Sequence, residues 1–497
     1  MKILSKTGDE ILLLAVTNDF ANKGDYFVIE DFNNNKKLLV QFYDEEYFSS
    51  SSLVEEIIKD EVISKFSTEN IFDPLEITNL SQTIRDVRIF KTKIRASIDN
   101  DNQISTDVDW VPSRVNSKIV KISLNEIKAL LKKNMRYPIS LGRCGSDNQN
   151  FEIFAEDLDG KLNIITGKKE TGKSHLSKIL INSLIQYGAY VIVFDLNNEY
   201  SGLSRNVDGT PSSISDKLLL LNPGRELKFN LTYFGKPSIS NMLKNALDMP
   251  SASLREFFRI WDSLENKKIL SLFELGKAFG TWTVNELVRD ALLSRFHMIN
   301  SSRLFSSNSV NERGFQFEDV IKTKPRGAAM IVNMSKISPV VRRMIVELVM
   351  NKLIELLEKS LIPPIFIFAE EAQLYIRDTY WEDLITRMRH FGIYSTFITN
   401  QPDAINDTIY RQVDNIFLFN FTNGTDLDKI SKVSLADTDT VRSIVRTLPQ
   451  RHCLVIGKVV RDLPMVVKVT SADVLALGQT KTFFTRRGNV PDTHFDR

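Results

Sequence analysis

The sequence predicts an α/β protein that begins with a separate β-rich domain, and three observations support this prediction. Within about the first 115 residues, short runs rich in Val, Ile and Phe alternate with polar turns. From about residue 140, nearly continuous apolar runs alternate with longer segments of helical spacing, as in parallel strands covered by helices on both faces. The 497 residues exceed the roughly 250 to 300 at which a single core stops growing, so we expect several domains.

Composition and charge restrict the classes of function. The chain is 42% hydrophobic and 25% charged, which is typical of a globular protein, and its net charge of +2 requires any nucleic-acid contact to be local, such as a pore lining. No apolar run approaches the roughly 20 residues that span a membrane, so we expect no membrane segment. The only two cysteines, Cys144 and Cys453, are far apart and favour a reducing, cytoplasmic setting. The five histidines lack metal-ligand spacing.

Five segments follow from these patterns. We predict an N-terminal β-barrel at 1–115, a first part of the α/β core at 116–223, a helical insertion at 224–325, a second core part at 326–475 and a C-terminal extension at 476–497. The barrel strands are EILLLAV, DYFVIED, KLLVQFY, RDVRIFKTKIRASI and SKIVKIS, with a short helix at Leu53–Phe66. The core strands are LNIIT, YVIVFD, AAMIVN, IFIFAEE, IYSTFIT and IFLFNF, followed by CLVIGKVV and PMVVKVT. The insertion carries capping-box pairs at Ser253/Glu256, Ser271/Glu274 and Thr283/Glu286.

A phosphate-binding loop is predicted between LNIIT and the helical segment HLSKILINSLIQY. Its residues fit G-x-x-x-x-G-K-[ST], a pattern whose glycines let backbone N–H groups converge on phosphate oxygens at a helix N-terminus. We expect Lys173 to neutralise the β- and γ-phosphates of ATP, and the Ser174 hydroxyl to bind Mg²⁺. The predicted nucleotide contacts are Gly167, Lys168, Lys169, Glu170, Thr171, Gly172, Lys173, Ser174 and His175. The alternative is a glycine turn that opens an ordinary helix.

Two acidic residues are predicted to complete this site. Glu370 and Glu371 end the buried strand IFIFA, at the strand edge where α/β sheets bind ligands. We expect Glu370 to hold Mg²⁺ and Glu371 to polarise the attacking water. The alternative is a helix N-terminus that attracts acidic residues through its dipole. Asp195 and Glu199 could support the metal or the water, although a solvated turn is also consistent with their sequence.

Arginines and a glutamine lie further along the chain. Arg387 and Arg389 precede the strand IYSTFIT, and Gln401 follows it. A guanidinium here could stabilise transition-state charge on a nucleotide bound by a neighbouring subunit, and Gln401 could sense the phosphate within its own subunit. The alternative for the arginines is a solvated helix C-terminus.

The ordered set of these motifs resembles HerA-type ATPases of the HerA/FtsK superfamily of P-loop NTPases. The shared order is a phosphate loop, a strand ending in D-x-x-x-E-Y, a strand ending in E-E-A, an R-x-F-G segment and a strand ending in Gln. The barrel segment PISLGRCGSDNQNFEIF and the late LPQRHCLVIGKVV are also similar. The sequence departs from the family at Gln373, at Arg387 to His390 and at Pro402, where the family commonly has His, E-G-R-K and Arg.

The resemblance implies a RecA-like ATPase core and an N-terminal HAS-barrel-like domain. It implies a homo-hexameric ring that pumps double-stranded DNA, with a nuclease or another effector docked on the barrel, in DNA repair or antiviral defence. It implies that Lys173 and Ser174 bind the nucleotide, that Glu370 binds the metal and that Glu371 polarises the water. It also implies that Arg389, or Arg387 as the fallback, is the trans arginine and that Gln401 is the sensor. Two alternatives remain open: an ATPase ring that acts as scaffold and switch for a partner enzyme, and a small-molecule phosphotransferase.

Overall fold

Contacts divide the chain into two units. In the computed structural model, one unit contains Met1–Leu176 and Thr399–Thr470, and the other contains Ser177–Ile398 and Ser471–Arg497. The structure describes residues 1–15, 19–48, 86–99, 104–130, 135–145, 148–306, 314–375, 387–433, 436–475 and 477. The helix predicted at Leu53–Phe66 and nearly all of the predicted C-terminal extension lie outside these residues.

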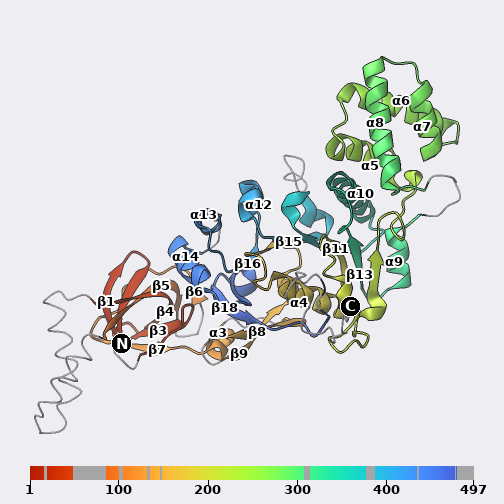
Figure 1. Ribbon diagram of the computed structural model, residues 1–497. Coiled ribbons are helices and arrows are strands. Elements are labelled where there is room, and N and C mark those ends of the chain that lie inside the picture. The colour runs from red at the N-terminus through yellow and green to blue at the C-terminus, as the bar shows by residue number, and fades with distance from the viewer. Residues whose placement is uncertain are drawn as a thin grey trace, which may run out of the picture. The chain divides into compact units, whose positions relative to one another are not determined.

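The N-terminal part of the first unit is an antiparallel sheet with strand order β1-β2-β5-β4-β3-β7, in which β6 pairs with β5 (Figure 1). Every second residue of its central strands faces one buried cluster, to which Ile11, Leu13, Phe27, Phe42 and Phe90 belong. All five predicted strands are confirmed, whereas β1 and β6 were not predicted; closure into a barrel stays a prediction. The strands are β1 (Lys2–Thr7), β2 (Glu10–Ala15), β3 (Tyr26–Asp31), β4 (Lys36–Tyr47), β5 (Arg88–Ile98), β6 (Ile104–Ser105) and β7 (Ser117–Lys121).

The remaining strands of the first unit follow the order β10-β16-β17-β18-β8-β9. Only β10 and β16 are parallel; the other neighbours are antiparallel. The predicted core range 116–223 includes the segment PISLGRCGSDNQNFEIF, and its description as a barrel segment is wrong, because β8 pairs with β18 through Cys144 and Val467. The strands are β8 (Pro138–Cys144), β9 (Gln149–Phe154), β10 (Asn163–Thr166), β16 (Asn415–Phe419), β17 (His452–Gly457) and β18 (Met465–Val469). The helices are α3 (Leu124–Leu130), α12 (Asp407–Tyr410), α13 (Gly424–Val433) and α14 (Thr438–Thr447).

The second unit contains parallel strands in the order β12-β13-β11-β14-β15. Every residue of β11 and β14 is buried, as expected of central strands covered on both faces. The strand β12 was missed because its sequence, four leucines, lacks the β-branched and aromatic residues that favour strands. The bounds are β11 (Tyr190–Asp195), β12 (Leu218–Leu221), β13 (Ala328–Asn333), β14 (Ile365–Glu370) and β15 (Ile393–Thr399).

Helices α5 to α9 lie between β12 and β13 in the chain, and α6, α7 and α8 pack against one another (Figure 1). The Ser271 side chain accepts the Glu274 N–H, so Ser271 is confirmed as the N-cap of α7. The other two predicted caps are wrong: α6 begins before Ser253, and Asn285 instead of Thr283 caps α8. The helices are α5 (Leu231–Asn241), α6 (Ser251–Asn266), α7 (Leu272–Thr281), α8 (Glu286–Ser302), α9 (Phe317–Thr323) and α10 (Pro339–Glu358). Among the described residues, no helix is both long and apolar enough to cross a membrane.

Candidate functional site

The predicted phosphate loop joins β10 to α4 (Lys173–Gln186), as the sequence pattern indicated. At Gly167 a side chain would place its Cβ 2.4 Å from the Phe419 Cβ, so this position has no room for one. Gly172 has a φ of +118° and lies against the Phe419 ring and the Arg451 backbone. Both glycines are therefore required by the path of the loop.

The Lys173 ammonium lies against the carbonyl oxygens of its own loop. Its Nζ donates to the Gly167 oxygen at 2.7 Å and to the Lys168 oxygen at 2.9 Å. Lys168, Lys169 and Glu170 are exposed, while Ser174 and His175 are half-buried. A phosphate bound in the loop would find this cation already beside the backbone amides.

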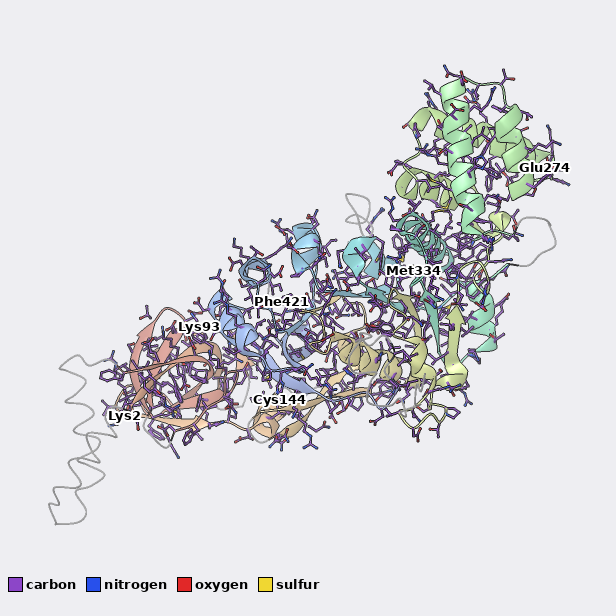
Figure 2. The ribbon with its side chains drawn as sticks, viewed as in Figure 1. Lys2, Lys93, Cys144, Glu274, Met334 and Phe421 are labelled. Carbon is purple, nitrogen blue, oxygen red and sulfur yellow. The ribbon has the colours of Figure 1, made fainter. Side chains whose placement is uncertain are left out.

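A turn that was not predicted to take part supports the loop from outside. The Arg451 N–H donates to the Thr171 oxygen at 2.9 Å, and the Gln450 Nε2 donates to the Glu170 oxygen at 3.1 Å. The Lys168 N–H donates to the oxygen of Asn420, between β16 and Phe421 (Figure 2). The motif LPQRHCLVIGKVV contains the turn, but its sequence carries no signal of contact with the loop.

In the second unit, Glu370 meets the end of the neighbouring strand β11. Its Oε2 accepts the N–H groups of Leu196 at 2.9 Å and Asn197 at 3.2 Å. Asp195 is fully buried, accepts the N–H groups of Glu199 and Tyr200, and shares a side-chain hydrogen bond with Glu370. The solvated-turn interpretation of Asp195 is therefore wrong.

Burial gives this carboxyl pair unusual electrostatics. Loss of solvent, reinforced by the charges of Glu199 and Asp195, raises the pKa of Glu370 to about 8. Burial also raises the pKa of Asp195, against the backbone hydrogen bonds that it accepts. The described residues contain no group of three or more His, Cys, Asp and Glu suited to a metal. One or two carboxylates suit Mg²⁺, which usually takes its remaining ligands from phosphates and water.

A buried lysine on α4 also contributes to this cluster. Lys178 is 3% exposed, and its Nζ lies 5.9 Å from the centre of the Tyr200 ring. Burial lowers its pKa, opposed by the charges of Glu199, Asp195 and Glu370. The Ser177 and Tyr200 hydroxyls are hydrogen-bonded at 2.8 Å. We did not predict Lys178, because a lysine in a helix is usually exposed.

Glu371 differs from Glu370 in backbone and surroundings. It has a φ of +47°, a conformation that costs a non-glycine residue about 1 to 3 kcal/mol and concentrates at functional sites. Its Oε2 accepts the Gln373 amide at 2.7 Å, whereas Glu370 contacts the end of β11. The two adjacent carboxyls therefore have different environments, as two separate roles require.

The arginines and the glutamine have defined places but untested roles. Arg387 is exposed and Arg389 half-buried in a helical turn that Gly392 ends with a φ of +89°. Gln401 is exposed after β15, and its N–H donates to the Thr399 hydroxyl at 3.0 Å. The trans-arginine and sensor roles stay predictions.

The α/β strands and the glycine-shaped loop define a P-loop NTPase fold, and solved structures agree. The conjugative coupling protein TrwB is 12% identical, with a TM-score of 0.51 over 73% of this chain and 94% of that one. VirB4 of Thermoanaerobacter pseudethanolicus is 13% identical, with a TM-score of 0.52 over 69% of this chain and 98% of that one. One such TrwB structure, with a TM-score of 0.51, contains ADP and Mg²⁺. These likenesses establish the fold alone.

Sequence comparison gives a more specific likeness. Residues 165–353 match the family described as "Helicase HerA, central domain". The DNA double-strand break repair helicase HerA of Saccharolobus solfataricus is 22% identical over 363 residues, which cover 66% of this chain and 69% of the relative. The protein of the same name from Sulfolobus acidocaldarius is 22% identical over 358 residues, covering 67% and 69%.

Proposed function

We propose that the protein is an ATP-driven, ring-forming translocase of double-stranded DNA. The match of residues 165–353 to the HerA central domain carries this proposal, because that span contains the complete phosphate loop. The buried carboxyls of Glu370, at the end of β14, and Asp195, at the end of β11, add the acidic residues that ATP hydrolysis requires.

In this proposal the phosphate loop binds the nucleotide, and the acidic cluster takes part in its hydrolysis. The loop amides and Lys173 bind the phosphates, and Ser174 with Glu370 would hold Mg²⁺, which would neutralise charge on the β- and γ-phosphates. Glu371 orients the attacking water. Arg389, or Arg387, stabilises the transition state in a neighbouring subunit, and Gln401 senses the γ-phosphate.

We also propose a homo-hexameric ring with a nuclease or another effector docked on the N-terminal domain. Two exposed apolar residues support a contact surface there: Phe32 is 62% exposed and Val115 is 88% exposed. The Phe32 N–H donates to the Asn116 oxygen, so the two apolar side chains belong to adjacent turns. Exposed apolar groups that share one surface region are characteristic of binding sites.

The decisive experiment measures ATP turnover with and without duplex DNA of increasing length, together with the mass of the assembly in solution. We expect DNA to stimulate turnover severalfold, and Lys173→Ala and Glu371→Gln each to reduce it by at least about a hundredfold. Absence of stimulation by DNA of any length would contradict translocation. If Glu371→Gln still assembles and leaves a partner's activity complete, the scaffold function is favoured instead.

A further inference from the structure

Two cationic side chains and a histidine stand in register across three neighbouring strands of the first unit. Lys468 on β18 is directly opposite Arg143 on β8, and also directly opposite His452 on β17. Directly opposite residues of antiparallel strands project from the same face, with Cβ atoms about 4.5 to 5.5 Å apart. Arg143, Lys468 and His452 therefore form one row, which we call the cationic row after the charges of Arg143 and Lys468; Cys144, beside Arg143, is labelled in Figure 2.

No carboxylate of the described residues forms an ion pair with Arg143 or Lys468. Among the residues that the structure describes, the only hydrogen bond of the Arg143 guanidinium is a long one, 3.4 Å, to the Asn148 oxygen. Like charges directly opposite on neighbouring strands destabilise a sheet. The row therefore lowers the stability of the free protein, and an anion that bridged its members would reverse this.

The cationic row lines a cavity of about 560 Å³ in the first unit. This volume lies within the roughly 300 to 1,000 Å³ of small-molecule sites. Two acids also line the cavity, but both are already paired: Asp25 with Lys121 at 2.6 Å, and Glu45 with Arg88 at 3.0 Å. The charge left for a ligand is therefore positive.

The cavity wall also has an apolar part. It is formed by side chains from both sheets and from α14, among them Tyr26, Phe42, Ile444, Leu448 and Met465. An inorganic anion would use the cations but leave this wall uncovered. A ligand that joins a phosphate to an apolar or planar group of nucleoside size would use both.

We propose that this cavity is a binding site, separate from the phosphate loop, for a small phosphorylated ligand such as a nucleotide. The cationic row binds its phosphates, and the apolar wall covers its nucleoside portion. The site does not depend on ATP hydrolysis. Because Leu448, Pro449 and His452 line the cavity and Gln450 and Arg451 between them hold the phosphate loop, an occupant would contact the turn that supports the loop.

The test uses the full-length chain with Lys173→Ala, which weakens the phosphate loop as a competing site. ADP, inorganic tripolyphosphate and a 20-base-pair DNA duplex are titrated, with calorimetry for affinity and thermal melting for stability. Added Lys468→Met should weaken ADP binding about tenfold, since a hydrogen bond to a charged group is lost. Added Lys118→Met removes an exposed lysine of β7 and should leave ADP affinity unchanged.

The melting temperature separates this role from a structural one. Without ligand, Lys468→Met should melt no lower than its parent, because the variant relieves repulsion within the row. ADP should raise the parent's melting temperature and raise that of Lys468→Met much less. Arg143→Gln is a second variant with the same expected pattern.

Three outcomes would overturn the proposal. Equal ADP affinity with and without Lys468 would show that the row binds no phosphate. If tripolyphosphate bound as tightly as ADP, the nucleoside portion would contribute nothing to binding, and the apolar wall would not be part of the site. If Lys468→Met weakened the binding of duplex DNA but not that of ADP, the row would be a contact for the DNA backbone. Because every arm measures binding in a protein that already lacks Lys173, none of these results depends on ATPase or translocase activity.

Discussion

Several non-glycine residues with left-handed backbone lie in or beside the proposed nucleotide site, three of them in the phosphate loop, next to Glu370 and in the supporting turn. Their φ values are +63° at Glu170, +47° at Glu371 and +61° at Arg451. The sequence pattern predicted the glycines of the phosphate loop from their chemistry. It could not predict these three, because tertiary contacts impose a left-handed conformation that local sequence does not favour.

Replacing Arg451 by glycine should stabilise the protein. An arginine at a φ of +61° is strained, whereas glycine adopts this conformation freely. Relief of the strain exceeds the cost of glycine's extra entropy in the unfolded chain, so the free energy of unfolding should rise by about 0.5 to 1 kcal/mol. Urea unfolding measures the change. Arg442→Gly, within α14, is the matched control and should cost about 1 kcal/mol. A loss of stability in Arg451→Gly would show that its side chain supports the turn.

Glu347, buried on α10, makes stability depend on pH. Burial raises its pKa, opposed by hydrogen bonds from Asn245 and Asn351. A carboxyl whose folded pKa is raised loses stability as pH rises above its unfolded value of about 4.3. Glu347→Gln should therefore be more stable than wild type at pH 8, on the order of 1 kcal/mol, and equal to it below pH 4.

Glu355 on the same helix provides the opposite control. Burial disfavours its charge, but hydrogen bonds and ion pairs with Lys359 and Lys352 outweigh burial and lower its pKa. Glu355→Gln should therefore lose stability at pH 8 and approach wild type at low pH. Unfolding free energies across the pH range compare both variants. If both variants changed the free energy of unfolding at pH 8 in the same direction, the environments assigned to Glu347 and Glu355 would be contradicted.

At the scale of elements, α14 connects the N-terminal sheet to the turn that supports the phosphate loop. Lys93 on β5 (Figure 2) lies 3.7 Å from Asp439, and Arg95 pairs with Asp437 at 2.7 Å. The Ser443 hydroxyl donates to the Tyr43 oxygen at 2.8 Å. The strands on both sides were predictable from their apolar residues, but these polar contacts were not, because they join residues more than 300 positions apart.

Two substitutions at Asp437 separate its roles at this junction. Its carboxyl caps α14 by accepting the Thr440 N–H, and it also pairs with Arg95. Asp437→Asn keeps the cap and loses the charge, whereas Asp437→Ala loses both and should be less stable by about a further 1 kcal/mol. Chemical unfolding measures both. Equal stability of the two variants would contradict the capping role.

The pH dependence of Asp437→Asn follows from the same contacts. Burial disfavours the Asp437 charge, but Arg95 and the Thr440 hydrogen bonds outweigh burial and lower its pKa. The stability contributed by the charge is complete above the unfolded pKa of about 3.9 and is lost as pH falls through the folded value. The deficit of Asp437→Asn should therefore shrink with acidification below about pH 4.

At the scale of the whole molecule, spacing and apolar character predicted most of the strands and the position of the phosphate loop, and the HerA resemblance was confirmed over residues 165–353. Pairing between distant strands was less predictable. The strands β8 and β9 lie close in sequence to the N-terminal sheet, but β8 pairs with β18, more than 300 residues later, and β9 pairs with β8. Local sequence defines a strand, whereas its partner depends on which exposed edge the rest of the fold provides.

If neighbouring subunits share active sites, two inactive variants should restore activity when mixed. Lys173→Ala lacks the loop cation and Arg389→Ala lacks the predicted trans arginine. Random assembly at equal concentration places an intact loop beside an intact arginine at about one interface in four, so up to about a quarter of wild-type ATPase activity should return. Steady-state turnover across mixing ratios measures this, and Arg387→Ala mixed in the same way determines which arginine acts. If both variants assemble and no ratio restores turnover, the sites are complete within one subunit.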